Sequence, residues 1–194
     1  MKHLFKKKRL LALCIVPLLA AAPILADSAK EAPKQEIVVD SKKKVEELSQ
    51  LMAKRLDLFK KLAAYKWNNK IPIDEPKKEE AFLIAIEEKA EEKGVDPKIA
   101  RAFFQSQLEA AKSIKIKAFE KWVKEDIHMH KEVVNIDETN SLIEECDNEL
   151  LDAMEEKSQD LKDQKRKDHL RVMISKALKE SQFPRDCIDS ATNF

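Results

Sequence analysis

The chain has 194 residues, of which 43% are hydrophobic and 38% charged, with one glycine, seven prolines and three cysteines. This length suffices for one domain-sized core, and a single glycine excludes the glycine-rich loops that bind phosphates or dinucleotides. Residues 1–26 contribute five positive charges and no negative one, so the formal net charge of +1 leaves −4 on the remainder, which gives no reason to expect nucleic-acid binding.

Residues 1–26 have the layout of a secretory signal peptide, with a basic start (MKHLFKKKR), an apolar stretch and the small residue Ala26 at a suitable cleavage position. A transmembrane anchor is the alternative. However, the apolar stretch of about 16 residues is short for a membrane span and is interrupted by Pro17 and Pro23. We therefore expect a periplasmic or secreted protein with no stable membrane insertion after cleavage. The polar residues 27–40 are expected to form a flexible leader.

Three amphipathic helices are predicted before residue 125, in a chain rich in good helix formers. The first covers 41–67, where apolar residues recur every three or four positions. The second starts at the acids and proline of 74–76 and stops at Gly94. The third starts at Asp96 and continues to about Lys124.

Two further helices are predicted in the C-terminal part. Residues 125–138 show no clear period and are expected to form a loop. The sequence SLIE at 141–144 matches a capping box that would open the fourth helix. The fifth helix is expected over 159–181, ended by Pro184. Five helices with short connections predict a single all-α, bundle-like domain over 41–194.

The cysteines and histidines give weaker signals. Cleavage of the signal peptide would leave Cys146 and Cys187, which could pair in an oxidising compartment; the alternative is two unpaired buried thiols. His128 and His130 form an alternating pair, but no third ligand stands at a recognisable spacing. We therefore predict no metal site.

The most informative residues are cations that lie on or beside the apolar stripes, namely Arg55, Lys66, Lys78 and Lys115. Arg55 and Lys66 are eleven positions apart, which places them on one helix face about 16 Å apart along the axis. Their long side chains could converge on the two ends of a small polyanion. A buried cation needs an acid, an anionic ligand or access to water. The alternative is that each stem packs while its charged group reaches solvent.

These residues lie in stretches that resemble the exported, gamma-type chorismate mutases of the all-helical class. The matching stretches are RLDLFKKLAAYKW (55–67), IPIDEPKKEE (71–80) and VDPKIARAFFQSQLEAAKSIKIKAFEKW (95–122). The resemblance covers about 45–122 and implies a chorismate mutase type II-like fold that converts chorismate, a dicarboxylate, to prephenate. This pericyclic reaction needs no cofactor. The site must hold the reactive conformer and stabilise charge growing on the breaking ether oxygen.

The resemblance also implies roles for individual residues. Arg55 matches an arginine that holds a substrate carboxylate, and Lys66 matches a lysine that donates to the ether oxygen and a carboxylate. Lys78 stands where the family has an arginine at the start of the second helix, and Glu75 occupies the acidic position just before it. Ala111 replaces a small hydroxyl residue. We therefore expect these five residues to contact the substrate.

Two positions depart from the family pattern. Lys115 stands where the family has Glu or Gln facing the ether oxygen, and a lysine can still donate a hydrogen bond there. Asn140 aligns with a carboxylate-binding arginine. We predict that Lys66 and Lys115 are the catalytic residues and chorismate the partner.

Two other functions and one assembly state stay open. The departures from the family pattern suggest a catalytically impaired relative that binds a small anion or a protein partner. A charged helical envelope protein is a third reading, which would expose the stripe cations and have no enclosed pocket. The sequence leaves a homodimer open.

Overall fold

The computed structural model describes residues 34–194, with side chains from Lys43 onward, and this part consists of helices without strands. Its seven helices are α1 (Lys34–Asn68), α2 (Pro76–Glu92), α3 (Pro97–Lys124), α4 (Ile136–Glu156), α5 (Ser158–Lys162), α6 (Gln164–Glu180) and α7 (Arg185–Ala191). The all-α prediction is confirmed, although seven helices replace the expected five. The predicted signal peptide, 1–26, lies outside the described residues.

The first three helices have the predicted order and nearly the predicted bounds. Helix α3 begins as expected, because the Asp96 carboxylate accepts hydrogen bonds from the Lys98 and Ile99 amides at 2.9 and 3.4 Å. Helix α1 begins at Lys34, seven residues before the expected start, so 34–40 are helical rather than part of a flexible leader. No glycine or proline interrupts the chain between Lys34 and Asn68, which allows this longer helix.

The C-terminal part differs more from the prediction. Helix α4 begins at Ile136 rather than at the expected capping box, because Asn135 caps it by accepting from the Glu138 amide at 3.2 Å. Ser141 lies inside α4, where its hydroxyl donates to the Asp137 carbonyl. The expected fifth helix is two helices, since Asp163 accepts from the Arg166 amide and starts α6.

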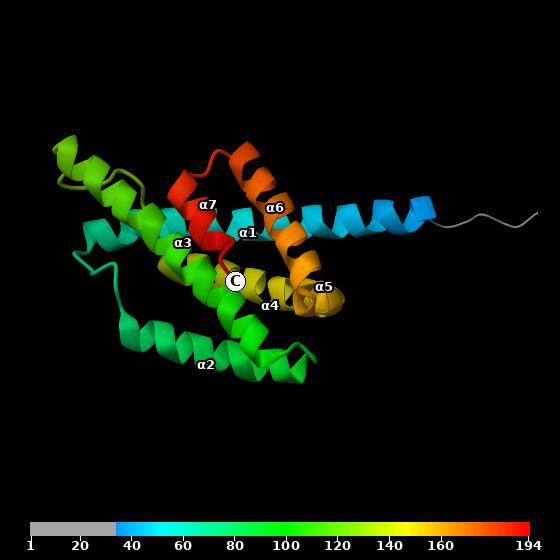
Figure 1. The fold of residues 1–194 in the computed structure, drawn as a ribbon. Helices are drawn as coiled ribbons and strands as arrows, with labels where there is room; N and C mark the ends of the chain where they lie inside the picture. Colours follow the sequence, from blue (N-terminus) through cyan, green and yellow to red (C-terminus); the bar gives the residue numbers. More distant parts are fainter. Residues whose placement is uncertain (1–33) are drawn as a thin grey trace, which may run out of the picture. The chain divides into compact units, whose positions relative to one another are not determined.

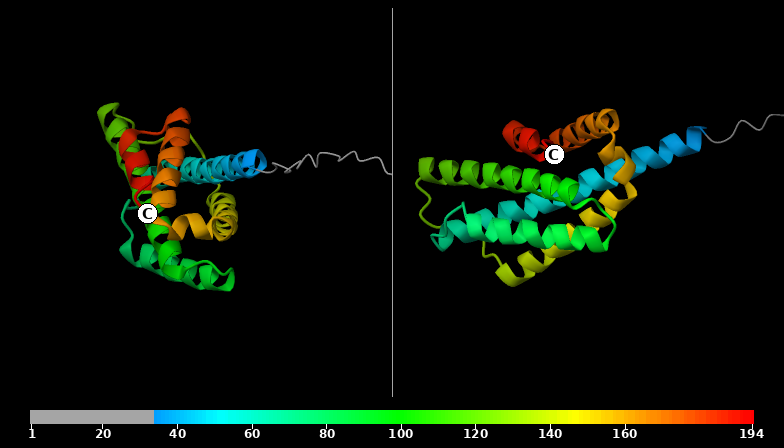
Figure 2. Two further views of the ribbon diagram at one scale, coloured as in Figure 1. Left: turned by 45° about the vertical axis from the view of Figure 1, so that its right-hand side comes forward. Right: turned by 60° about the horizontal axis from the view of Figure 1, so that its bottom comes forward.

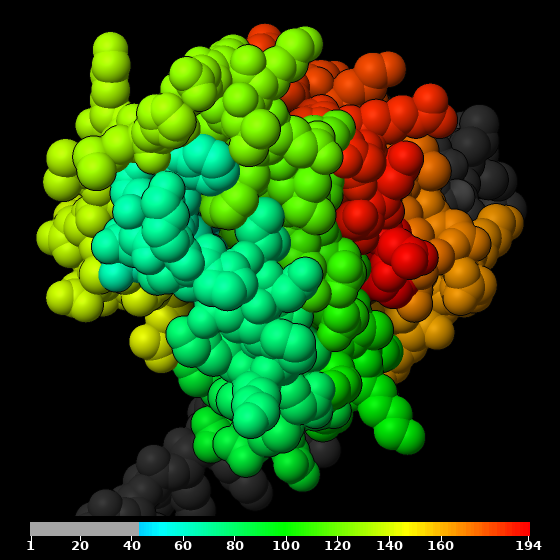
Figure 3. Space-filling view, turned by 90° about the vertical axis from the view of Figure 1, so that its left-hand side faces the viewer, coloured from blue at the N-terminus to red at the C-terminus, as the bar shows by residue number. Residues whose placement is uncertain are grey.

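Helix α7 was expected as a tail, and its stability depends on tertiary contacts. It packs against α3, and Figure 3 shows α7 in red lying on the green α3. The Ala191 carbonyl accepts hydrogen bonds from the side chains of Ser106 and Gln107 on α3, at 3.3 and 3.1 Å. The aromatic ring of Phe194 then packs on Phe103. These contacts join residues about 85 positions apart, so local sequence patterns do not reveal them.

Helices α1 and α3 form the centre of the domain (Figure 1). Helix α1 packs against α3, α4 and α6, and α3 packs against α2 and α7. In Figure 2, α6 and α7 lie on one side of the α1–α3 pair, and α2 and α4 lie on the other. No helix within residues 34–194 has the length and apolar character needed to cross a bilayer. The packing brings four helices, α1 to α4, around one cavity.

Candidate active site

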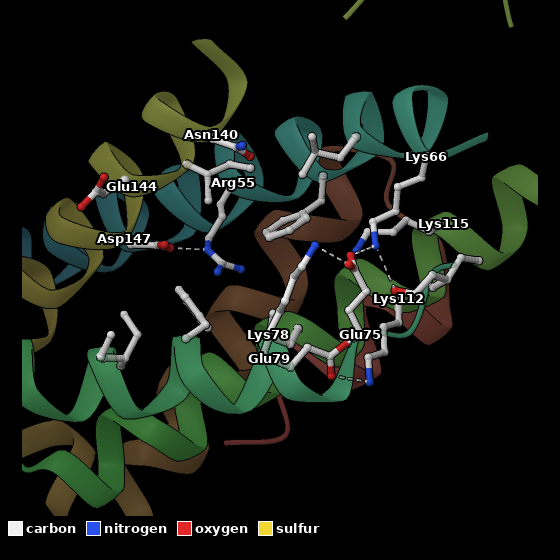
Figure 4. Close-up of a pocket in the computed structure, with 18 of the residues that line it drawn as sticks. Arg55, Lys66, Glu75, Lys78, Glu79, Lys112, Lys115, Asn140, Glu144 and Asp147 are labelled. Atoms are coloured by element: carbon white, nitrogen blue, oxygen red, sulfur yellow. Dashed lines mark hydrogen bonds and ion pairs between the residues drawn. The ribbon is translucent and has the colours of Figure 1, made fainter. Parts of the chain in front are cut away.

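A cavity of about 450 Å³ lies among α1, α2, α3, α4 and the α1–α2 linker. Its apolar walls include Phe59, Phe82, Leu108 and Ile143. Its charged lining residues are six cations and four acids: Arg55, Lys66, Lys78, Lys89, Lys112, Lys115, Glu75, Glu79, Glu144 and Asp147. Figure 4 labels all of these except Lys89 and shows them coming from the four helices and the α1–α2 linker. Arg55 and Lys115 are buried at this cavity while Lys78 is exposed, so the structure departs from the envelope-protein reading at the two buried cations.

Arg55 is fully buried in the wall that α1 contributes. Its Nε donates a 2.6 Å hydrogen bond to Oδ1 of Asp147 on α4. Its Cζ lies 4.7 Å from the Phe59 ring centroid, 5.4 Å from that of Phe104 and 5.6 Å from that of Phe82. Neither Nη atom has a hydrogen-bond acceptor among the described residues. The predicted inward orientation of Arg55 is confirmed, and both of its terminal nitrogens have unused donor capacity.

Lys66 closes the cavity at the C-terminal end of α1. Its ammonium donates to the carbonyls of Pro72 and Ile73 at 2.7 and 3.3 Å and to Oε2 of Glu75 at 2.5 Å. The exposed Lys78 also pairs with Glu75, at 2.5 Å. Hydrogen bonds from Lys66 and then Lys78 lower the pKa of the Glu75 carboxyl below its usual value. The three residues therefore form one ionic cluster that holds the α1–α2 linker against α1.

Lys115 is 6% exposed and has no carboxylate within ion-pair distance among residues 43–194. Its Nζ lies 4.9 Å from the centroid of Phe59, the same ring that Arg55 contacts. Burial, followed by the charges of Lys66 and Arg55, lowers the pKa of Lys115 to about 8 against the opposing effect of Glu79 and Glu75. Lys115 is therefore a second buried cation with unused donor capacity at the cavity.

The remaining two cations of the lining each have an acidic partner. Lys112 pairs with Glu79 at 2.8 Å, and Lys89 pairs with Glu144 at 3.0 Å. The hydrogen bond that Lys112 donates to Glu79 raises the pKa of Lys112, the opposite of the change at Lys115. Arg55 and Lys115 are thus the buried lining cations whose donors are not all used by acceptors among the described residues.

The α4 wall contributes no cation to the cavity. It presents Asn140, Ile143, Glu144 and Asp147. Asn140, which aligns with a family arginine, lies at the cavity as the alignment predicts. Sequence reasoning missed Asp147, which is buried on α4. An acid one turn after Ile143 on an apolar stripe was the available signal, the same kind that identified the cations.

Three other predicted residues are not part of the cavity lining. Ala111 is fully buried in a cluster with Leu58, Phe59 and Leu62, and it is not among the lining residues. Its contact with substrate stays a prediction. Cys146 and Cys187 are both free and buried in separate hydrophobic clusters, so the structure has two unpaired thiols rather than a disulfide.

Comparison with known proteins shows which family the sequence around these residues resembles. Residues 46–116, which include Arg55, Lys66 and Lys115, match the family model "Chorismate mutase type II". The chain is 26% identical over 112 residues to the secreted chorismate mutase of Mycobacterium tuberculosis, which covers 58% of this chain and 56% of that protein. Over residues 46–116 the chain is therefore similar to chorismate mutases of type II. It spans about half the length of this curated relative.

Solved chorismate mutases share the fold. The enzyme from Burkholderia thailandensis aligns with a TM-score of 0.66 at 24% identity, over 77% of this chain and 95% of that one. The Burkholderia phymatum enzyme aligns with a TM-score of 0.68 at 16% identity, over 77% and 94%. The secreted enzyme from Yersinia pestis aligns with a TM-score of 0.58 at 20% identity, over 74% and 91%. The helices of this chain therefore follow the arrangement of these solved structures beyond residue 116.

Proposed function

We propose that this protein is an exported chorismate mutase that rearranges chorismate to prephenate in the cation-lined cavity. The reaction breaks one C–O ether bond and forms one C–C bond within the same molecule, so no atom, proton or electron leaves. The pocket therefore needs to hold the reactive conformer and to stabilise negative charge on the ether oxygen. Resident cofactors and metals have no part in this proposal.

The observation that carries the proposal is that two buried cations keep hydrogen-bond donors without a protein acceptor. Arg55 and Lys115 lie beside one phenylalanine ring, Phe59, in a cavity of about 450 Å³. A buried cation with unsatisfied donors is costly, and a dicarboxylate ligand would satisfy both. The cavity lining carries six cations and four acids, so its excess of positive charge matches a dianion when Lys115 is protonated.

The contacts also suggest how the roles are divided. Arg55 would hold one carboxylate through Nη1 and Nη2, in the bidentate geometry that guanidinium groups favour. Lys115 would donate to the ether oxygen, since its ammonium has no protein acceptor among the described residues. Lys66 already donates to Glu75 and two carbonyls. It would therefore add positive charge near the ether oxygen while it holds the linker, and Lys78 and Glu75 complete that wall.

Chorismate consumption tests the proposal. Protein expressed from the full-length sequence should consume chorismate and form prephenate faster than the uncatalysed reaction, followed by absorbance. Arg55→Ala and Lys66→Ala should each lower kcat/KM at least about tenfold, the effect of losing one electrostatic donor. Lys121→Ala, at an exposed position of α3 outside the cavity, is the control and should leave the rate unchanged. A rate equal to the uncatalysed one would refute the enzymatic function.

A second candidate is a binding protein that does not catalyse. It is favoured by the α4 wall, where Asn140 replaces a family arginine and Glu144 adds a negative charge. Such a protein would be stabilised thermally by chorismate without consuming it, and Arg55→Ala would abolish this stabilisation. Turnover by the parent protein would exclude this candidate.

Export is supported by the signal-peptide layout of residues 1–26 and by the secreted relatives in Mycobacterium tuberculosis and Yersinia pestis. Sequencing the N-terminus of the protein recovered from the cell envelope or medium tests it. We expect cleavage after Ala26. An intact N-terminus in the cytosolic fraction would contradict export.

A further inference from the structure

We infer that Asp147 is a positioning residue that holds Arg55 by its Nε and so directs both Nη atoms toward the ligand carboxylate. This inference rests on the proposed function, because it concerns how the same cavity grips its ligand. The α4 wall contributes no cation to the cavity, and this inference gives α4 a role in ligand binding through its acid, Asp147. In Figure 4, the Asp147 carboxylate and the Arg55 guanidinium meet at the cavity.

The geometry of the pair leaves one edge of the guanidinium free. Asp147 Oδ1 accepts from Nε at 2.6 Å, and the pair is nearly inaccessible to water, with 0% and 6% of the two side chains exposed. A carboxylate can bind a guanidinium through the Nε edge or through the Nη1–Nη2 edge. Because Asp147 occupies Nε, the edge that still lacks an acceptor is the buried one formed by Nη1 and Nη2.

The surroundings of Arg55 strengthen this argument. Three phenylalanine rings surround the guanidinium but supply no hydrogen-bond acceptor: Phe59, Phe82 and Phe104. They limit the positions that the planar group can take, and Asp147 fixes its rotation with a hydrogen bond between charged groups. Burial raises the pKa of the Asp147 carboxyl, and the charge of Arg55 acts in the opposite direction. Each member of the pair thus makes the burial of the other tolerable.

The pair differs from the other ion pairs of the cavity. Lys89 and Glu144 are more exposed, and the Lys112–Glu79 pair leaves no buried donor unused. Only for Arg55, within the described residues of the cavity lining, does one carboxylate satisfy one nitrogen and leave two buried nitrogens for a ligand. An ion pair that only stabilised the fold would not need to leave the two Nη atoms of Arg55 without an acceptor.

Two substitutions at Asp147 separate positioning from folding. Asp147→Asn keeps an oxygen that can accept from Nε, so kcat/KM should stay within about threefold of the parent. Asp147→Leu removes the acceptor, so kcat/KM should fall at least about tenfold, mainly through a higher KM. Asp152→Asn is the matched control on α4, since Asp152 pairs with Lys93 at the surface and should have no effect.

A double-mutant cycle shows whether Asp147 acts through Arg55. Arg55→Met and Asp147→Leu together replace the buried pair by apolar side chains, which should recover much of the melting temperature that either single change loses. The kcat/KM of the double variant should equal that of Arg55→Met, because Asp147 has no effect once Arg55 is absent. A further loss of kcat/KM on adding Asp147→Leu to Arg55→Met would overturn the inference.

A measurement on the protein without ligand tests the role of Asp147 independently of the proposed function. The Nε–H signal of Arg55 in an ¹H–¹⁵N spectrum, assigned by its loss in Arg55→Lys, should exchange slowly with water in the parent and in Asp147→Asn. It should exchange rapidly or disappear in Asp147→Leu. An unchanged signal in Asp147→Leu refutes the positioning role, whereas absence of chorismate turnover in the parent refutes the proposed function alone.

Discussion

Lys115 makes the activity of this protein depend on pH in a way that one substitution should remove. Its ammonium must be protonated to donate positive charge to the cavity, and burial lowers its pKa from 10.5 to about 8. The charged groups that face it are Arg55 and Lys66 from α1, Glu75 from the linker and Glu79 from α2. Raising the pH through 8 should therefore neutralise Lys115 and weaken binding of a dianion.

The size of the effect follows from the pKa. At pH 9, one unit above this pKa, about one tenth of the molecules keep the positive charge on Lys115. The kcat/KM at pH 9 should therefore be about tenfold below its value on the neutral plateau. The lowered pKa corresponds to about 3 kcal/mol against the charged form. Because the unfolded chain keeps this proton up to about pH 10.5, Lys115 should make the free energy of unfolding rise between pH 8 and 10.5.

The assay compares the parent with Lys115→Gln from pH 6 to pH 10, subtracting the uncatalysed rate at each pH. Glutamine still offers an N–H donor but does not titrate, so its kcat/KM should be lower at pH 7 and should lack the fall near pH 8. Lys121→Gln, an exposed lysine on the same helix, should keep the parent profile. If Lys115→Gln shows the same fall at the same pH, Lys115 is not the titrating group and the reasoning is wrong.

Three further predictions concern the linker, a helix cap and the thiols. Glu75→Gln should lower the melting temperature at pH 7, and the difference from the parent should shrink as pH falls below 4.5, because Lys66 and Lys78 stabilise the ionised carboxylate. Asp96→Ala should cost about 1 kcal/mol in urea unfolding by removing the α3 cap. Reductant should leave the melting temperature unchanged, and alkylation of Cys187 should require unfolding, because burial raises its pKa to about 12.

The sequence predicted the first three helices well because their signals are local. Apolar residues recur along α1, Pro76 opens α2, and Asp96 caps α3 within three residues of the amides that it binds. The fourth helix was placed too late because SLIE fits a capping box in its own local context, while Asn135 is the cap that the chain uses. Helix α7 was missed because its stability depends on α3, far away in the sequence.

In the candidate site, too, local sequence patterns predicted some features and only the packing of helices determined the others. Periodicity sufficed to place Arg55 and Lys66 on a common face of one helix and Lys115 on the apolar stripe of another, and the family resemblance singled out Asn140. Helical spacing says nothing about which acid a cation meets on another helix. The packing of α1 against α4 pairs Arg55 with Asp147, and the folded linker pairs Lys66 with Glu75.

Composition and periodicity by themselves therefore determined an all-α domain with inward-facing cations, since helix propensity and amphipathic spacing are properties of neighbouring residues. Only the tertiary structure decided which of those cations are free to bind a ligand. Arg55 keeps two unused nitrogens and Lys115 has no carboxylate partner among the described residues, whereas Lys66, Lys78, Lys89 and Lys112 are paired. The availability of a buried charge depends on partners from other helices, because a carboxylate within a few ångströms cancels most of the charge that a ligand would otherwise meet.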